Sequence, residues 1–377
     1  MFVRITNCSP LDYATDIERQ KAIQSFLDSH GERTHIVQCK KSVCDDIIRS
    51  GLFGDIHNKF ASDLLDMKHE IGTLKHSFEI ILIIDFNFDD SYIESTLDGG
   101  IFKITASHHF LLRSSFKNKC IFLAEDESDC EFFTLIAKTI TKSTFGKSVN
   151  ISFNNLEGGG ARTHKKYLKI LNEREFGVCI VDNDKKHPKG PEGSTSSVFK
   201  PARNQRGYAV NQECIVLDFH EAESIIPQDV LQKIIDPSKI DTLDKIGYYD
   251  KISDFQFRRF FDHKNGIELS KGWELDGKHA NGFWNQFFSK ERNYQSKPCR
   301  ANKVCINEKH DIQCHSCIKI EGFGDKILVD SIEEMENIHL KPIYSKLTPQ
   351  LRSQWNYIGR KLINWGCTLS LPPIKSF

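Results

Sequence analysis

The stretch "CIFLAEDESDCEFF", Cys120–Phe133, decides how the middle of the chain folds. Its first five residues are mostly apolar, as in a buried strand, and acidic or hydroxyl residues follow from Glu125. Apolar residues then return at helical spacing. A strand that ends in carboxylates is either the start of a helix, where the helix dipole favours acids, or the edge of a metal site.

The segments that follow alternate between the patterns of strands and helices. We expect strands at 119–125, 149–153, 176–184 and 213–219, and helices at 129–142 and 162–171. This alternation predicts βαβ units and a mainly parallel, Rossmann-like α/β sheet. In such a sheet, ligands bind at the carboxyl ends of the strands.

Carboxylates occur at three of these strand ends. Glu125 ends the first strand, Asp182 and Asp184 end the third in "VDND", and Glu221 and Glu223 follow the fourth in "HEAES". Because side chains alternate along a strand, Asp182 and Asp184 are expected to face the same side. The sequence therefore predicts that these acids converge at one edge of the sheet.

Crowded carboxylates repel one another, and either raised pKa values or a bound cation must relieve the repulsion. Oxygen ligands suit Mg²⁺ or Mn²⁺ rather than Zn²⁺, and such ions with open coordination positions are typical of phosphate chemistry. The structural alternative is that Ser128 or Asp129 simply caps a helix. We favour the shared metal site because three acidic clusters coincide with strand ends.

Taken together, "FLAEDESD", a Gly-rich turn, "VDND" and "HEAES" resemble the Toprim domain over roughly residues 118–230. That domain occurs in primases, topoisomerases, recombination-mediator repair proteins and OLD-family nucleases. By this resemblance, Glu125 matches the family's strand-end Glu, and Asp182 and Asp184 match its Asp-x-Asp. Asp129 matches an acid that OLD-like nucleases carry four positions later. Asp126 stands where the family often has Gly, which is similar to the OLD-like proteins that work with ABC-type ATPases in phage defence.

The resemblance implies a nuclease that hydrolyses phosphodiester bonds in DNA or RNA with one or two Mg²⁺ or Mn²⁺ ions. Glu125, Asp182 and Asp184 would be catalytic. "HEAES" approaches a family segment of the form (H/R)E-x-EN, with Ser224 in place of Asn. The implied metal ligands are Glu125, Asp129, Asp182, Asp184, Glu221 and Glu223.

The resemblance also implies a partner, a separate ABC-type ATPase or sensor protein, and allows a homodimer. One alternative is a non-cleaving Toprim-plus-zinc scaffold of the recombination-mediator type that only binds nucleic acid. A primase-like polymerase is another alternative.

The turn "EGGGARTHKKYLKIL" (157–171) places three glycines before a basic helix. Glycines let a backbone approach phosphate, and a helix N-terminus offers unpaired N–H groups. The alternative is a flexible turn followed by a solvated helix face. The Gly-Lys-Ser/Thr ending of a P-loop is missing, so we expect no P-loop nucleotide hydrolysis. The expected nucleic-acid contacts are Arg162, Lys165, Lys166 and Lys169 on one helical face, with Lys185 and Lys186 beyond "VDND".

The segment 299–317 is rich in cysteine. Its Cys-x5-Cys-x8-Cys-x2-Cys spacing favours a structural Zn²⁺ site, although the first spacing is loose and His310 or His315 could replace a cysteine. Unliganded thiols in a polar loop are the alternative. Cys39 and Cys44 lack a second pair nearby and are interpreted as ordinary thiols. The predicted zinc ligands are Cys299, Cys305, Cys314 and Cys317.

The 377 residues suggest more than one domain, and Lys plus Arg and Asp plus Glu both total 51. We expect an N-terminal α/β domain (1–117), a Toprim catalytic domain (118–232) and a helical, zinc-stapled C-terminal region (233–377). We expect neither a signal peptide nor a membrane-spanning segment, and hence a cytoplasmic protein. The aromatic residues at 255–288 are interpreted as core packing. A rival metal site at Asp85, Asp89 and Asp90, or a function for His108 and His109, is less favoured.

Overall fold

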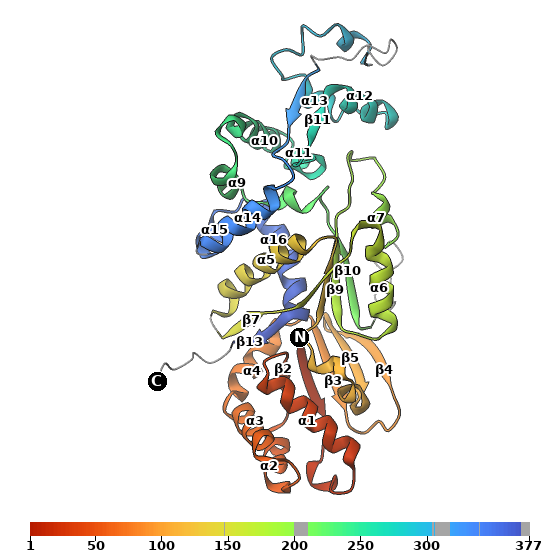
Figure 1. Cartoon of the computed structure of the whole chain (residues 1–377), viewed down its shortest axis with the longest axis vertical. Coiled ribbons are helices and arrows are strands. Elements are labelled where there is room, and N and C mark those ends of the chain that lie inside the picture. Colours follow the sequence, from red (N-terminus) through yellow and green to blue (C-terminus); the bar gives the residue numbers. More distant parts are fainter. Residues whose placement is uncertain (147, 200–209, 304, 306–316, 339, 371–377) are drawn as a thin grey trace. The chain divides into compact units, whose positions relative to one another are not determined.

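The computed structural model describes residues 1–146, 148–199, 210–303, 305, 317–338 and 340–370. The chain forms two compact units (Figure 1). Unit 1 comprises Met1–Ile180, Pro201–Ile215 and Trp355–Phe377, and unit 2 comprises Val181–Lys200 and Val216–Gln354. The division at 117 and 232 stays a prediction.

The first sheet of unit 1 has five strands in the order β2-β1-β3-β5-β4. The pairs β1–β2, β1–β3 and β3–β5 are parallel, and only the β4–β5 pair is antiparallel. After β1, the chain adds β2 on one side of it and then β3 on its other side. The direction in which strands are added therefore reverses between β1 and β3. The elements are β1 (Phe2–Thr6), α1 (Ile17–Gly31), β2 (Ile36–Gln38), α2 (Lys41–Ser50), α3 (Asp55–Asp66), α4 (Lys68–Leu74), β3 (Ile80–Asp85), β4 (Ile93–Asp98) and β5 (Ile101–Ser107).

The second sheet of unit 1 has the order β10-β9-β6-β8. β6 pairs in parallel with β8 and with β9. Consecutive parallel strands are connected by helices, which confirms the predicted α/β alternation. Figure 1 shows α5 and α6 on opposite sides of this sheet, as right-handed crossovers in opposite directions require. The elements are β6 (Ile121–Ala124), α5 (Glu127–Phe145), β8 (Asn154–Glu157), α6 (Thr163–Asn172), β9 (Gly177–Val181) and β10 (Gln212–Val216).

The strand predicted at 149–153 differs from the observed structure. β7 (Val149–Ile151) pairs antiparallel with β13 (Cys367–Leu369), outside the four-stranded sheet. The strand that joins β6 is the polar β8, "NNLE", which lies at the edge of the sheet and is largely exposed. An edge strand needs little apolar surface, so its sequence carries no hydrophobic signal.

Unit 2 is mainly helical and has an aromatic core. Phe257, Trp284, Phe287 and Phe288 are fully buried, which confirms that the aromatic residues of this region pack in a core. The elements are α7 (Ser194–Ser197), α9 (Gln228–Ile234), α10 (Ile240–Ile252), α11 (Gln256–Phe260), β11 (Gly266–Glu268), α12 (Leu269–Lys278), α13 (Asn285–Phe288), β12 (Lys319–Glu321), α14 (Ile327–Asn337) and α15 (Leu340–Lys346). The last helix, α16 (Pro349–Gly366), begins in unit 2 and ends in unit 1.

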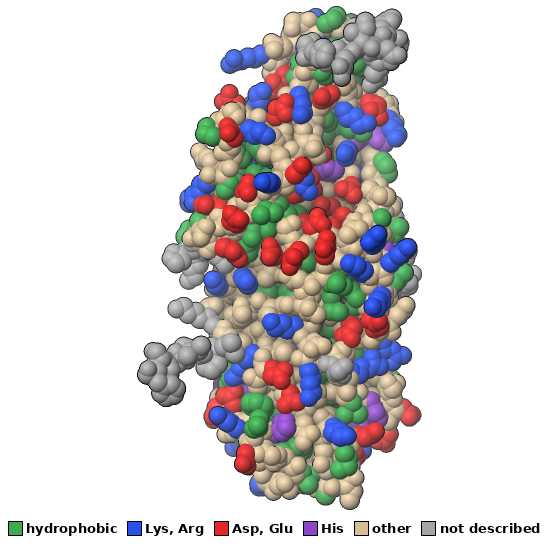
Figure 2. Space-filling view, in the orientation of Figure 1, with side chains coloured by type: hydrophobic (Ala, Val, Ile, Leu, Met, Phe, Trp, Pro, Cys, Tyr) green, Lys and Arg blue, Asp and Glu red, His purple; other side chains and the backbone are tan. Residues whose placement is uncertain are grey.

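Among the described residues, no helix combines the length and the hydropathy needed to cross a membrane. Acidic and basic side chains both occur across the face seen in Figure 2. This distribution agrees with the balanced totals of 51 acidic and 51 basic residues.

Candidate metal centre and nucleic-acid contacts

Glu125 directly follows β6, as the sequence predicts. β6 is in register with β9, Leu123 opposite Cys179, so the carboxyl ends of both strands lie at the same edge of the sheet. The N–H of Gly158 donates to the Ala124 carbonyl at 2.7 Å, and the N–H of Gly159 donates to the Glu125 carbonyl at 2.9 Å. The Gly-rich turn therefore fixes the backbone of Glu125.

Gly158 is needed for close packing. A Cβ at this position would lie 2.1 Å from Thr163 Oγ1 and 2.6 Å from the Ala124 carbonyl oxygen. The N–H groups of Gly158 and Gly159 already donate to the end of β6. Any phosphate contact in this region must therefore come from other groups, such as the first turn of α6.

Asp129 belongs to the N-terminal cap of α5. The N–H of Asp126, the N-cap residue, donates to Asp129 Oδ2 at 3.0 Å. This is one half of a capping box, in which the residue at N3 reaches back to the N-cap. The capping role considered above is thus present, and the role of Asp129 as a metal ligand stays a prediction.

The "VDND" segment runs beside the segment that carries "HEAES" in unit 2. The N–H of Leu217 donates to the Val181 carbonyl at 2.9 Å, and the N–H of Asp184 donates to the His220 carbonyl at 3.0 Å. The side chain of Asn183 adds a third bond, to the Leu217 carbonyl, at 3.0 Å. These bonds hold the two acidic segments together, and the convergence of their carboxylates with Glu125 stays a prediction.

The prediction that Asp182 and Asp184 face the same side of a strand is wrong in its premise. β9 ends at Val181, and Asp184 has a left-handed backbone with φ of 53°. Alternation of side chains requires extended backbone, which stops before these residues. Asp184 instead packs closely against Gly193, where a Cβ would lie 2.3 Å from Asp184 Oδ2.

Glu221 and Glu223 are buried, with 5% and 1% of their surfaces exposed. Lys264 Nζ lies 3.0 Å from Glu223 Oε1 and 3.9 Å from Glu221 Oε2. The backbone N–H of His263 also donates to Glu221 Oε1. The ammonium of Lys264 therefore lies within ion-pair distance of two buried carboxylates.

The pKa values reflect this crowding. Burial raises the pKa of Glu221 well above its usual value, and the charges of Glu223 and Asp262 raise it further. Burial alone would lower the pKa of Lys264, but Glu223 and Glu221 outweigh it and raise this pKa, and Asp182 contributes in the same direction. Asp182 thus belongs to the electrostatic environment of Lys264.

A histidine and a further acid extend the cluster. His220, Glu221 and Asp262 each place one ligand atom within 4.8 Å of the others. His220 Nδ1 and Glu223 Oε2 are buried and make no hydrogen bond to any residue that the structure describes. Carboxylates with one imidazole suit Mn²⁺, and the carboxylates alone suit Mg²⁺, so the donor set fits the predicted ions.

Lys264 is positioned by backbone contacts. The carbonyl of His263 accepts from the N–H of Phe323 at 2.7 Å, and the carbonyl of Lys264 accepts from that of Gly324 at 2.9 Å. Asp262 Oδ1 accepts from the N–H of Asn265 at 2.7 Å. Our sequence analysis missed His220, Asp262 and Lys264, because only the folded chain brings "DHK" at 262–264 beside "HEAES".

The predicted phosphate contacts are largely at the surface. Arg162 ends a short 3-10 helix, Gly160–Arg162, before α6, and Lys165 is exposed. Lys166 Nζ donates to the Glu157 carbonyl, and Lys169 Nζ lies 3.8 Å from Glu173 Oε1. These residues can meet a nucleic-acid backbone, but their nucleic-acid role stays a prediction.

The two lysines beyond "VDND" lie in unit 2. The backbone N–H of Lys185 donates to Asn183 Oδ1 at 2.8 Å. The carbonyl of Lys186 accepts from Trp284 Nε1 at 2.9 Å, and the Lys186 side chain is exposed. Their backbones are therefore fixed while the Lys186 ammonium faces solvent.

Part of the predicted zinc site lies outside the described residues, namely Cys314, His310 and His315. Cys299 lies in a 3-10 helix, Pro298–Ala301, and both Cys299 and Cys317 pack against the aromatic core of unit 2. Cys305 is half-buried. The zinc site stays a prediction.

Comparison with protein-family models, with curated proteins and with solved structures gives no match to this chain. Its chemistry therefore has to be argued from its own residues.

Proposed function

We propose that this chain is a Mg²⁺- or Mn²⁺-dependent nuclease of the Toprim type that hydrolyses phosphodiester bonds in DNA or RNA. The observation that carries the proposal is the pairing of two buried carboxylates, Glu221 and Glu223, with the single cation Lys264. The raised pKa of Glu221 reflects more carboxylate charge than Lys264 can balance, and a divalent cation would neutralise this excess in place of a proton. Glu223 Oε2, which has no hydrogen-bond partner in the described part of the chain, is a ready ligand atom.

The residues divide the chemistry among them. A bound divalent ion supplies polarisation of the phosphoryl group and a lower pKa for an attacking water. Glu221, Glu223 and Asp182 would hold the ion. Lys264, whose ammonium remains protonated among these acids, would stabilise the charge that develops on the phosphoryl oxygens.

The strand order supports a contribution from Glu125. Glu125 follows β6 and Asp182 follows β9, and these strands are parallel neighbours at the point where the chain order reverses. Ligands of open α/β sheets bind at the carboxyl ends of strands at such a reversal. By the Toprim resemblance, the proposal keeps Glu125, Asp182 and Asp184 as catalytic residues, and the ion pair with Glu223 adds Lys264.

The biological setting rests on the Toprim resemblance alone. On that basis the chain is proposed to be a cytoplasmic effector of phage defence. A separate ABC-type ATPase would control it, and segment 299–317 would hold a structural Zn²⁺. An ATPase encoded beside this gene would be the first partner to test.

The test is cleavage of labelled single- and double-stranded DNA and RNA with Mn²⁺ or Mg²⁺, with the chain alone and with that ATPase. Glu223→Gln and Lys264→Met should abolish cleavage. Glu274→Gln and Lys271→Met, which alter an exposed ion pair in the same unit, should not. Binding of nucleic acid without cleavage under all these conditions would overturn the nuclease proposal and favour the non-cleaving scaffold.

A further inference from the structure

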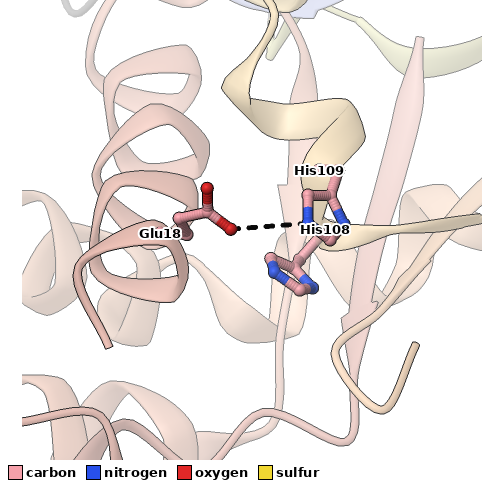
Figure 3. Close-up of side chains that lie close together, drawn as sticks. All are labelled: Glu18, His108 and His109. Atoms are coloured by element: carbon pink, nitrogen blue, oxygen red, sulfur yellow. Dashed lines mark ion pairs between the residues drawn. The ribbon is translucent and has the colours of Figure 1, made fainter. Parts of the chain in front are cut away.

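A second group of ligand-type side chains lies in unit 1, at the carboxyl edge of its five-stranded sheet. His108 and His109 directly follow β5 and begin a 3-10 helix, His108–Leu112. Glu18 lies in the first turn of α1. Figure 3 shows the two imidazole rings beside each other, with the Glu18 carboxylate from α1 facing them.

The distances among these three side chains are short. One ring nitrogen of each histidine and one oxygen of Glu18 all lie within 4.8 Å of one another. His109 Nε2 lies 3.5 Å from Glu18 Oε2, and the ring centroids of His108 and His109 are 4.2 Å apart. Small side-chain rotations would bring these three atoms to the spacing of ligands around one metal ion.

Each histidine is held by a second contact. Ser107 Oγ lies 3.5 Å from His109 Nδ1, which leaves Nε2 for Glu18 or a metal. His108 stacks on Phe86 with a centroid distance of 5.5 Å and is only 3% exposed. Contacts that orient a histidine through its other ring atoms are typical of metal ligands.

The buried ring nitrogen Nδ1 of His108 is an independent indication of a ligand at this site. This atom makes no hydrogen bond to any residue that the structure describes. A buried polar atom without a partner is costly, so it usually has a ligand or a functional reason.

The topology favours a ligand site at this edge. The chain order reverses between β1 and β3, the neighbour of β5. Asn7, after β1, donates from Nδ2 to Asp85 Oδ1, at the end of β3, at 2.9 Å. The ends of β1, β3 and β5 are in register, so the polar residues that follow them lie at one edge of the sheet, where open α/β sheets bind ligands.

We propose that Glu18, His108 and His109 bind a divalent transition-metal ion of the Zn²⁺ class. Two imidazoles and one carboxylate suit such ions, whereas Mg²⁺ prefers oxygen ligands. Three protein ligands leave at least one position for water or a small ligand, as in catalytic rather than structural zinc sites. This site is separate from the carboxylate centre of unit 2 and does not depend on the nuclease proposal.

The test is a Co²⁺ titration of the full chain after chelator treatment, in excess Mg²⁺ to occupy carboxylate sites. Co²⁺ bound to the two histidines gives visible d–d absorption without the sulfur-to-metal charge transfer of a cysteine site. Glu18→Gln and His109→Gln should each weaken this sulfur-free site by at least about tenfold, since even the loss of an orienting contact has that effect. His69→Gln, which alters an exposed histidine of the same unit, should bind Co²⁺ like the wild type.

Circular dichroism of each metal-free variant checks that unit 1 is folded, and the exposed Glu18 makes Glu18→Gln the safest variant. A sulfur-free Co²⁺ titration that is the same in both variants as in the wild type would overturn the proposal. So would a wild type that binds no Co²⁺ beyond its cysteines, which would leave Glu18 and His109 as an ordinary ion pair.

Discussion

Lys264 Nζ lies 3.0 Å from Glu223 Oε1, although Glu223 is almost completely buried. The same ammonium lies 3.9 Å from Glu221 Oε2. Desolvation offsets most of the attraction within buried ion pairs, so such a cluster contributes little net stability. Its value to the protein is therefore expected in chemistry, and its removal should affect activity more than folding.

The first prediction concerns catalysis. Lys264→Met should lower the rate of metal-dependent phosphodiester cleavage by at least about a hundredfold, because it removes a fixed positive charge from the reacting group. The measurement is the initial cleavage rate at saturating Mn²⁺. Lys271→Met is the matched control, since Lys271 pairs only with the exposed Glu274 among the described ion pairs. A rate equal to that of the wild type would remove Lys264 from the mechanism.

The second prediction concerns how much the ion pair between Lys264 and Glu223 contributes to the free energy of unfolding. Lys264→Met leaves Glu223 buried without its cation and should lower the free energy of unfolding by about 1–3 kcal/mol. The side chain of Lys264 is 34% exposed, so the loss should be smaller than for a fully buried pair. Adding Glu223→Gln to Lys264→Met should recover part of the lost free energy of unfolding. The coupling free energy between the two substitutions should be about 1 kcal/mol. Urea unfolding of the single and double variants, without metal, measures this cycle, and additive losses would contradict it.

The buried strands could be predicted from the sequence because burial leaves a pattern. β3 and β9 are runs of apolar residues, as expected for parallel strands covered on both faces. β8 could not be predicted, since its exposed position at the sheet edge allows the polar sequence "NNLE". The sequence also predicts the end of β9 too late, because neither Gly nor Pro marks the point after Val181 where the strand stops.

The candidate sites likewise contain residues that could be predicted from the sequence and residues that could not. Strand-end acids such as Asp182 and Glu221 could be found because a parallel sheet brings its strand ends together. Lys264 comes from a loop after α11 that has no periodic pattern, and contacts with residues distant in sequence, such as Phe323 and Gly324, place it. Glu18 and His109 are likewise far apart in the sequence, and only the packing of α1 near the end of β5 joins them.

The third prediction tests how the Gly-rich turn supports Glu125. Gly158→Ala should lower the free energy of unfolding by about 1–3 kcal/mol, because its Cβ would overlap Thr163 and the Ala124 carbonyl. To relieve this overlap, the backbone of the turn must move. The movement should also displace Glu125, whose carbonyl accepts from the N–H of Gly159, and so reduce cleavage.

Gly72→Ala is the control for this substitution. Gly72 lies in α4 and has open space around its Cα, so alanine should stabilise the helix by up to about 1 kcal/mol. Thermal unfolding of both variants gives the comparison. Equal effects of the two substitutions would show that the close approach at Gly158 does not constrain the turn.

The fourth prediction concerns the acid stability of unit 1. His35 is fully buried beside Phe116, whose carbonyl lies 2.9 Å from His35 Nε2. Burial, with the nearby charged amino terminus, lowers the pKa of His35 from 6.5 to about 3. The folded state therefore binds fewer protons than the unfolded state between these two pH values. Stability from this group is present above pH 6.5 and is lost as the pH falls towards 3, by up to about 1.4 kcal/mol per pH unit.

His35→Gln should remove this slope while keeping a side-chain donor for the Phe116 carbonyl. The measurement is urea unfolding of wild type and variant from pH 7 down to about pH 4. Other titrating groups, including the buried His30, cancel in the difference between the two profiles. His76→Gln, which changes an exposed histidine of unit 1, should follow the wild-type profile. A His35→Gln profile parallel to that of the wild type would mean that His35 is already protonated, or is hydrated, in the folded protein.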